Sequence, residues 1–176
     1  YNKFSDKGQF LSRILNIIHL INIKSQLETL DYFKGSQITM AIEITSGAVV
    51  YRKNNGEIEY LLLESQNKGH FWGFPKGHVE GNETLEETAK REIKEETQLV
   101  LPIDTSFHVY TEYDLPNGNR KQMTLYTADL TQSEDIHLQA EEIKNCGWFN
   151  YADARERLTY DNLKQLLDQV NDHLTK

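Results

Sequence analysis

The sequence has 176 residues, 38% of them hydrophobic and 26% charged, a composition typical of a globular domain with a substantial core. Its formal net charge of −8 argues against DNA binding, and its single cysteine excludes an internal disulfide framework and a thiolate zinc cluster. A lone cysteine suits a reducing cytoplasm, and no run of residues is long and apolar enough to span a membrane. We therefore expect a cytoplasmic monomer or homodimer without stable membrane association.

The first predicted element is an amphipathic helix from about Gly8 to Phe33, because apolar residues recur there at helical spacing. Residues 1–39 carry a net charge of +2, whereas the rest of the chain carries −10. This break predicts an N-terminal helical extension over residues 1–39 and a separate folded domain over residues 40–176. A packing or dimer helix, or sequence from outside the natural gene product, is favoured over a membrane-surface helix, because the polar face is not strongly basic.

Strands dominate the chain after Met40. Two runs rich in β-branched and aliphatic residues, Ile42 to Arg52 and Ile58 to Leu63, flank the turn signal Asn54-Asn55-Gly56 and predict a β-hairpin. The elements expected next are a helix, two strands around a turn, a short strand and two helices, over residues 84–97, 108–114, 122–130, 146–149, 151–158 and 161–174. Strands, helix, strands and helices in this order predict an α+β domain with a mixed sheet covered by helices.

The helix over residues 84–97 has the most informative pattern. Thr84 followed by Glu87 is a capping box, which predicts where the helix begins. Glu92, Glu95 and Glu96 stand at positions i, i+3 and i+4, so their carboxylates share one helix face. Crowded like charges are unfavourable unless a cation neutralises them, and grouped carboxylate oxygens suit Mg²⁺ or Mn²⁺. The alternative is a solvated acidic face, which we favour for the other glutamates of this helix.

Arg91 has two candidate partners. It lies one turn after Glu87 on the same helix, and it can also reach back to Glu83 in the preceding loop. The second contact would brace the loop against the helix and orient the neighbouring carboxylates.

The spacing of these residues matches a family motif. The pattern is Gly77, five residues, Glu83, seven residues, then Arg91-Glu92-Ile93-x-Glu95-Glu96. This segment resembles the Nudix box. The resemblance implies a Nudix α/β/α sandwich and hydrolysis of a nucleoside diphosphate linked to another group. One position departs from the family pattern, because Gln98 stands where glycine is expected, and we expect a slightly different helix end without loss of the site.

The resemblance also implies roles for the box residues. Glu95 and Glu96 correspond to Mg²⁺ ligands, and Glu92 corresponds to a ligand or to the base that activates water. Arg91 and Glu83 belong to the same catalytic set.

Two further metal contacts are implied outside the box. The carbonyl of Lys76 often completes the metal shell in this family. A glutamate from the loop before the last strand is also expected, and the spacing favours Glu142 over Glu141. The alternative for Glu142 is a solvated loop carboxylate.

The surroundings of the box resemble the asymmetrical diadenosine tetraphosphate hydrolases. The resemblance covers most of residues 41–150 and rests on Ser46–Tyr51, Tyr60–Leu63 and Trp72–Val79, with Pro-Lys-Gly-His as its most distinctive part. Met40 falls where such domains usually begin, which makes it a candidate natural start.

Five residues are candidates for binding a nucleotide polyphosphate. Lys76 and His78 can present cationic or donor groups to phosphates beside the box. The resemblance implies that Tyr113 stacks on adenine and that Lys121 contacts phosphate, and Tyr126 is assigned to the same site. The alternatives are a strand histidine with one local hydrogen bond for His78 and an exposed strand aromatic for Tyr113.

The resemblance implies Mg²⁺-dependent cleavage of diadenosine tetraphosphate to ATP and AMP by direct attack of water. Cys146 stands where some relatives have a second aromatic residue, so a two-sided base sandwich is in doubt. The alternatives are another Nudix phosphohydrolase, acting on diphosphoinositols, capped RNA ends or nucleoside triphosphates, and a non-catalytic nucleotide sensor. The intact glutamates at 92, 95 and 96 argue against the sensor.

Overall fold

The computed structural model describes residues 40–131 and 135–176. The extension expected over residues 1–39, with its helix and its boundary at Met40, lies outside these residues. The described elements, in chain order, are β1 (Ile42–Asn54), β2 (Glu57–Ser65), β3 (Trp72–Gly73), β4 (Lys76–His78), α2 (Leu85–Thr97), β5 (Asp104–Asp114), β6 (Arg120–Asp129), β7 (Ile143–Asn150), α3 (Tyr151–Arg157) and α4 (Asp161–Leu174). None of the described helices is long and apolar enough to cross a membrane.

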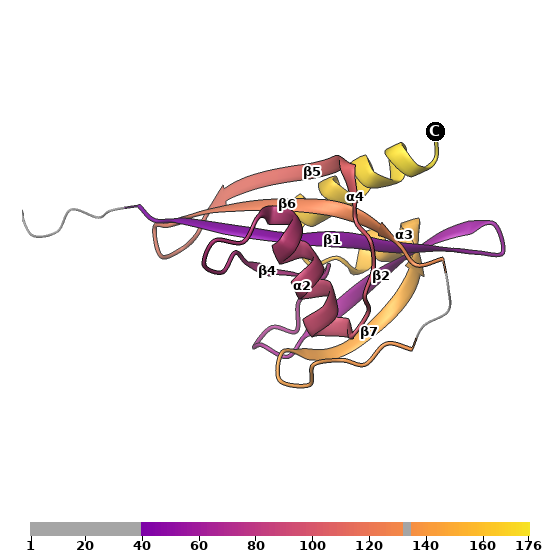
Figure 1. The fold of residues 1–176 in the computed structure, drawn as a ribbon, viewed down its shortest axis with the longest axis horizontal. Coiled ribbons are helices and arrows are strands. Elements are labelled where there is room, and N and C mark those ends of the chain that lie inside the picture. Colours follow the sequence, from indigo (N-terminus) through magenta and orange to yellow (C-terminus); the bar gives the residue numbers. More distant parts are fainter. Residues whose placement is uncertain (1–39, 132–134) are drawn as a thin grey trace, which may run out of the picture. The chain divides into compact units, whose positions relative to one another are not determined.

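All seven described strands belong to one mixed sheet (Figure 1). Its central order is β3-β2-β1-β6-β5, with β4 paired to β1 and β7 paired to β2. Strands β1 and β6 are parallel, and the other pairs are antiparallel. Along one edge, β1 pairs first with β4 at residues 45–47 and then with β2 at residues 51–54. This change of partner places the short strand β4 beside the start of β1.

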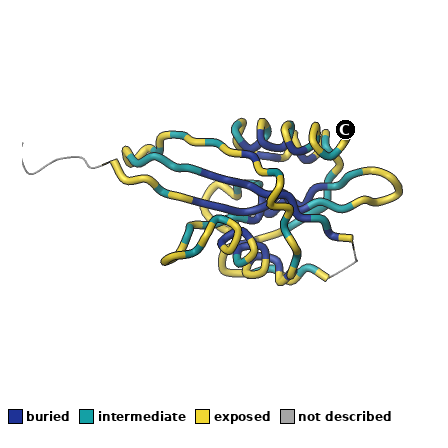
Figure 2. The backbone as a smooth tube through the Cα atoms, turned by 45° about the horizontal axis from the view of Figure 1, so that its top comes forward, coloured by how far each residue is buried: buried dark blue, intermediate teal, exposed yellow. Residues whose placement is uncertain are grey.

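Helices cover both faces of the sheet. Ala48 and Val50 of β1 share a buried cluster with Ile93 of α2, whereas Val49 shares a second cluster with Leu166 of α4. Successive residues of a strand point to opposite faces, so β1 supplies both cores. Figure 2 shows the buried middle of the sheet between its exposed ends. The expected α+β class, with a mixed sheet between helices in an α/β/α sandwich, is therefore confirmed.

The first predicted hairpin is present, with positive φ angles of 51° at Asn55 and 89° at Gly56. Two positive φ angles in succession match the turn that suits the twist of a β-hairpin. The segment between this hairpin and α2, expected to be a loop, also contains β3 and β4. These strands are two and three residues long. Strands this short have no periodicity of their own and depend on pairing with β2 and β1.

The C-terminal end of α2 differs from the expectation. Gln98 adopts the left-handed conformation, with φ 62° and ψ 4°, and its N–H donates to the carbonyl of Lys94 at 2.8 Å. The expected change in the helix end is therefore wrong, because glutamine takes the conformation that glycine favours. The left-handed conformation costs a non-glycine residue roughly 1–2 kcal/mol, which the rest of the fold offsets.

Replacing Gln98 with glycine is expected to raise the free energy of unfolding by up to about 1 kcal/mol, because the strain is relieved at a helix end that already has the glycine conformation. The matched control is Gln165→Gly inside α4, where glycine should lower stability by about 1 kcal/mol. Urea unfolding of the two variants measures both effects. A loss of stability in Gln98→Gly would show that the glutamine side chain contributes more than its backbone strain costs.

Candidate active site

Two of the three clustered carboxylates of α2 are buried. Glu92 and Glu96 are each 7% exposed, whereas the side chain of Glu95 is 51% exposed. The predicted capping box is present: Thr84 Oγ1 accepts from the N–H of Glu87 at 3.2 Å, and a Glu87 carboxylate oxygen accepts from the N–H of Thr84 at 2.8 Å. This cap fixes the start of α2 and hence the rotation that turns Glu92 and Glu96 toward the sheet.

Strand β4 packs directly on the buried carboxylates. The backbone N–H of Lys76 donates to Oε2 of Glu96 at 3.2 Å. A Cβ atom added at Gly77 would lie 2.0 Å from Oε1 of Glu92, so only glycine lets that carboxylate approach the strand so closely. Close packing against Glu92 therefore explains why the first residue of the motif, Gly77, is a glycine.

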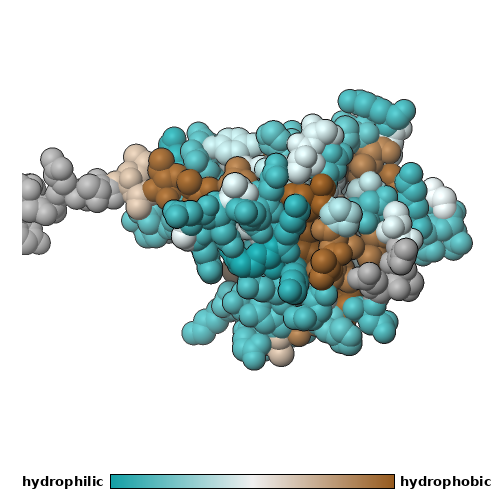
Figure 3. Space-filling model, viewed as in Figure 1, coloured by the Kyte–Doolittle hydropathy of each residue, from teal (hydrophilic) through white to brown (hydrophobic). Residues whose placement is uncertain are grey.

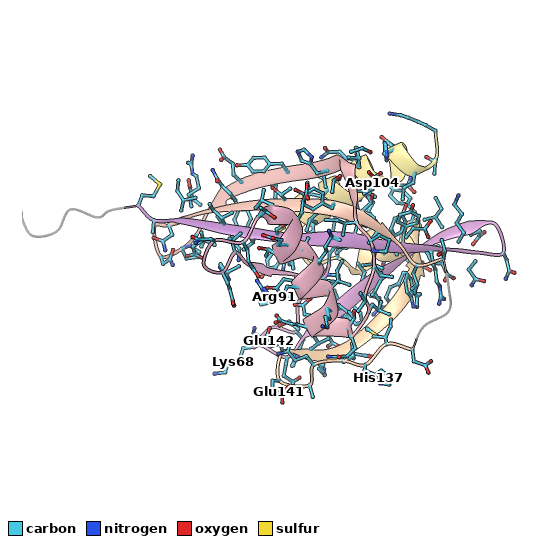
Figure 4. All side chains as sticks on the ribbon, viewed as in Figure 1. Lys68, Arg91, Asp104, His137, Glu141 and Glu142 are labelled. Atoms are coloured by element: carbon cyan, nitrogen blue, oxygen red, sulfur yellow. The ribbon has the colours of Figure 1, made fainter. Side chains whose placement is uncertain are left out.

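The buried carboxylates have raised pKa values. Burial raises the pKa of Glu96 to about 8, the positive charge of Lys76 opposes this shift, and the charges of Glu92 and Glu142 add to it. Burial also raises the pKa of Glu92, with further increases from Glu95 and Glu142. Glu142, in the loop before β7, is therefore close enough for its charge to act on both carboxylates (Figure 4).

Arg91 takes the second of its two candidate roles, because it reaches back to Glu83 and not to Glu87. Its Nε and Nη2 donate to the two carboxylate oxygens of Glu83 at 2.8 and 3.0 Å, and Nη2 also donates to the carbonyl of His78 at 2.9 Å. The guanidinium holds the pKa of Glu83 down, at about 2. This network ties the loop before α2, strand β4 and the helix together.

Arg91 also contacts two of the clustered carboxylates. Its Nη1 donates to Oε1 of Glu92 at 2.7 Å and to Oε2 of Glu95 at 2.9 Å. The sequence did not indicate these contacts. They orient both carboxylates and partly neutralise their charge.

The donor set fits a hard divalent cation in its chemistry. Glu92, Glu95, Glu96 and Glu142 supply only carboxylate oxygens, the type of ligand that Mg²⁺ and Mn²⁺ prefer. Among the described residues, however, no three candidate ligand side chains converge closely enough to enclose an ion. Hydrogen bonds from the described residues engage one oxygen each of Glu92, Glu95 and Glu96, which leaves a second oxygen on each for a metal.

A cationic region adjoins the carboxylates. Lys76 lies close enough to Glu96 to lower its pKa, and the same lysine acts on Lys121 of β6. Burial lowers the pKa of Lys121, and the positive charge of Lys76 lowers it further. Two neighbouring ammonium groups in a partly buried place favour a bound anion such as phosphate.

Two tyrosines adjoin the lysines. Tyr113 of β5 pairs in register with Lys121 and packs partly against the core. Burial raises its pKa, and the electrostatic effect of Tyr160 raises it further. Tyr160 is 46% exposed, and its ring centroid lies 5.2 Å from that of Phe71. Sequence reasoning missed Tyr160, because its approach to Tyr113 depends on how α4 packs on the sheet.

His78 makes the one local contact expected of a strand histidine and is also exposed. It belongs to β4, its side chain is 58% exposed, and its Nε2 lies 3.3 Å from Oε2 of Glu43 on β1. It remains accessible beside Lys76.

The assignment of Tyr126 to the substrate site is wrong. Tyr126 follows Lys121 by an odd number of positions on β6, so the two side chains point to opposite faces of the sheet. Tyr126 is 7% exposed and packs in the core beneath α2. Cys146 packs against the same core, away from Tyr113, so its identity does not decide whether a base has a second aromatic contact.

Comparisons with known proteins agree with this arrangement. Residues 43–170 match the NUDIX domain. An asymmetrical bis(5'-nucleosyl)-tetraphosphatase of Caenorhabditis elegans is 34% identical over 125 residues, which cover 69% of this chain and 89% of that protein. The mitochondrial Nudix hydrolase 17 of Arabidopsis thaliana is 30% identical over 137 residues, which cover 73% of this chain and 74% of that protein. A crystal structure of a C. elegans Ap4A hydrolase binary complex superposes with a TM-score of 0.71 at 32% identity, covering 76% of this chain and 98% of that one.

The fold, together with the buried glutamates that pack against Gly77 and Lys76 of β4, is that of a hydrolase of phosphoanhydride bonds. The chain belongs to the Nudix family, since the matched domain covers more than half of it. Within that family it is similar to the asymmetrical bis(5'-nucleosyl)-tetraphosphatases.

Proposed function

We propose that this Nudix hydrolase cleaves diadenosine tetraphosphate asymmetrically, to ATP and AMP, with Mg²⁺ as its cofactor. The observation that carries the proposal is the order of groups along the site. The backbone N–H of Lys76 donates to the buried Glu96, the charge of Lys76 acts on Lys121, and Lys121 pairs in register with Tyr113. This order fits a polyphosphate with a base at its far end.

The carboxylates carry the chemistry in this proposal. Glu95, Glu96, Glu142 and the carbonyl of Lys76 are the proposed metal ligands, and Glu92 accepts the proton of the attacking water or shares in the ligation. Bound Mg²⁺ would offset the charge that develops on the phosphates and ease deprotonation of water. The water oxygen forms a bond to one phosphorus as the anhydride oxygen leaves in line, so no covalent enzyme intermediate is required.

Residues outside the box select the substrate. Lys76, His78 and Lys121 bind phosphate oxygens, and Tyr113 and Tyr160 hold the adenine. A base anchored at the tyrosines fixes which phosphate lies over the carboxylates. The same anchoring favours a nucleotide over a diphosphoinositol, which has no base to stack.

Incubating the protein with diadenosine tetraphosphate and Mg²⁺, and separating the products by chromatography, tests the proposal. ATP and AMP in equal amounts are expected, whereas two molecules of ADP would contradict the anchoring. Faster cleavage of a diphosphoinositol or a nucleoside triphosphate in the same panel would replace the proposed substrate.

Replacing Tyr113 with alanine is expected to raise KM about tenfold or more while kcat changes less, because stacking is similar in the ground and transition states and is worth roughly 1–3 kcal/mol per base. Tyr113→Phe retains the ring and should keep KM near the wild-type value. The matched control is Tyr110→Ala on the opposite face of β5, where the tyrosine is 48% exposed. Equal effects of the two alanine variants on KM would rule out a specific role for Tyr113.

A further inference from the structure

Glu43 is an acidic side chain within the cationic, aromatic part of the site. On β1 it pairs in register with Lys121 of β6, which in turn pairs with Tyr113 of β5. Residues in one row across a sheet point to the same face, and neighbouring strands are about 4.8 Å apart. Glu43, Lys121 and Tyr113 therefore form one row on the face that the substrate is proposed to occupy.

The carboxylate of Glu43 is held in place by neighbours on two other elements. Its Oε1 accepts from the side-chain amide of Asn119 at 2.9 Å, and its Oε2 lies 3.3 Å from Nε2 of His78. Its side chain is 27% exposed. The Asn117 side chain also interacts with this carboxylate. An ionised carboxylate has about four acceptor positions, so these neighbours leave at least one of them for a ligand.

These contacts and neighbouring charges keep Glu43 ionised. Hydrogen bonds from Asn119 and His78 lower its pKa, and the charge of Lys121 lowers it further. The charge of Glu43 also acts on Tyr113, which lies two strands away in the same row. An ionised carboxylate can only accept hydrogen bonds, so its natural partner is a ligand group that donates, such as a hydroxyl.

We infer that Glu43 binds the ribose 2′- and 3′-hydroxyls of the nucleotide whose base lies at Tyr113 and Tyr160. Those hydroxyls are hydrogen-bond donors, and Glu43 shares its row with Lys121 and Tyr113, the residues proposed for phosphate and for the base. Carboxylates bind ribose hydroxyls in the same way at dinucleotide sites of other folds.

The inference rests on the proposed function for the presence of a nucleotide, and it adds a sugar-binding group to that site. It also gives a reason for discrimination. A ligand with a phosphate in place of either hydroxyl would bring that phosphate against the carboxylate. A ligand that lacks the hydroxyls would leave an oriented anion without its partner, which is costly.

Equilibrium binding of ATP and of 2′,3′-dideoxy-ATP to the full chain, measured by calorimetry with Mg²⁺, tests the inference. Chromatography after each titration confirms that the nucleotide is intact. Wild type is expected to bind ATP about tenfold more tightly than 2′,3′-dideoxy-ATP, which is the usual scale for hydrogen bonds to a charged group. Glu43→Gln should weaken ATP binding by a similar factor and leave dideoxy-ATP binding nearly unchanged. The effects of removing the carboxylate charge and of removing the ribose hydroxyls should therefore not be additive.

Two further variants keep the test specific. Glu112→Gln alters a carboxylate on the opposite face of the same β5–β6 hairpin and should preserve the preference for ATP. Asn119→Ala removes one orienting contact but keeps the carboxylate, so it should reduce the preference without abolishing it.

Additive effects of Glu43→Gln and of hydroxyl removal would overturn the inference, as would equal or undetectable binding of the two nucleotides by wild type. Cleavage is measured separately. If diadenosine tetraphosphate is not hydrolysed but the preference for ATP depends on Glu43, the proposed reaction fails and the sugar-binding role stands.

Discussion

Glu96→Gln is expected to lower turnover by at least about a hundredfold in a protein that stays folded. Glu96 is 7% exposed and lies under the backbone N–H of Lys76. Glutamine has almost the same shape but carries no negative charge, so it supplies a weaker ligand to a divalent cation. Removing one preorganised electrostatic group from an active site typically costs a factor of about 10²–10³ in kcat.

Steady-state rates at saturating substrate and Mg²⁺ measure this loss, and circular dichroism checks the fold. The matched control is Glu86→Gln on the exposed first turn of α2, which should keep kcat within a few-fold. Near-normal turnover in a folded Glu96→Gln protein would show that the metal site lies elsewhere.

In EDTA, which removes divalent metal ions, the free energy of unfolding of Glu96→Gln is expected to depend on pH less than that of wild type. The pKa of Glu96 is raised from 4.5 to about 8 in the fold, so the folded protein holds this proton more tightly than the unfolded chain does. The stability linked to this group is fully present below pH 4.5 and is lost as pH rises through about 8. Urea unfolding should show that the free energy of unfolding of wild type falls over this pH range, and that it falls less in Glu96→Gln. An identical pH dependence in both proteins would contradict the raised pKa.

The features that sequence predicted well depend on residues close together in the chain. The capping box of Thr84 and Glu87 fixes the start of α2 through two local hydrogen bonds. The spacing of Glu92 and Glu96 then places both carboxylates on one face. The hairpin at Asn55-Gly56 is equally local, because its φ angles are those that these residues tolerate.

The features that sequence missed depend on packing between distant segments. Tyr160 approaches Tyr113 only because α4 packs on the face of β5, and nothing in the local pattern near residue 160 indicates this. Strand β4 forms because it pairs with β1, and its position determines that Gly77 meets Glu92. For Tyr126 the sequence was sufficient, because the alternation of side chains along a strand puts it on the opposite face from Lys121 and so away from the substrate site.

Arg91→Ala is expected to reduce kcat at least about tenfold and to lower the free energy of unfolding by about 2–3 kcal/mol. The guanidinium of Arg91 is 19% exposed and donates to Glu83, Glu92, Glu95 and the carbonyl of His78. Its removal leaves partly buried carboxylates without their donor, and breaking such a network typically costs several kcal/mol. Arg91→Lys should be intermediate, because lysine retains the charge but not the planar fork that reaches four partners.

Mg²⁺ separates the two roles of Arg91, which neutralises charge and also positions the carboxylates. The ion can replace the lost positive charge, so Mg²⁺ should raise the melting temperature of Arg91→Ala by more than that of wild type. It cannot restore the tie between Glu83, strand β4 and the helix, so kcat should remain at least about tenfold low at saturating Mg²⁺. Arg155→Ala, which removes a surface ion pair with Asp168, is the control and should change neither quantity much. Full recovery of kcat in Arg91→Ala at high Mg²⁺ would mean that Arg91 acts through its charge alone and does not position the carboxylates.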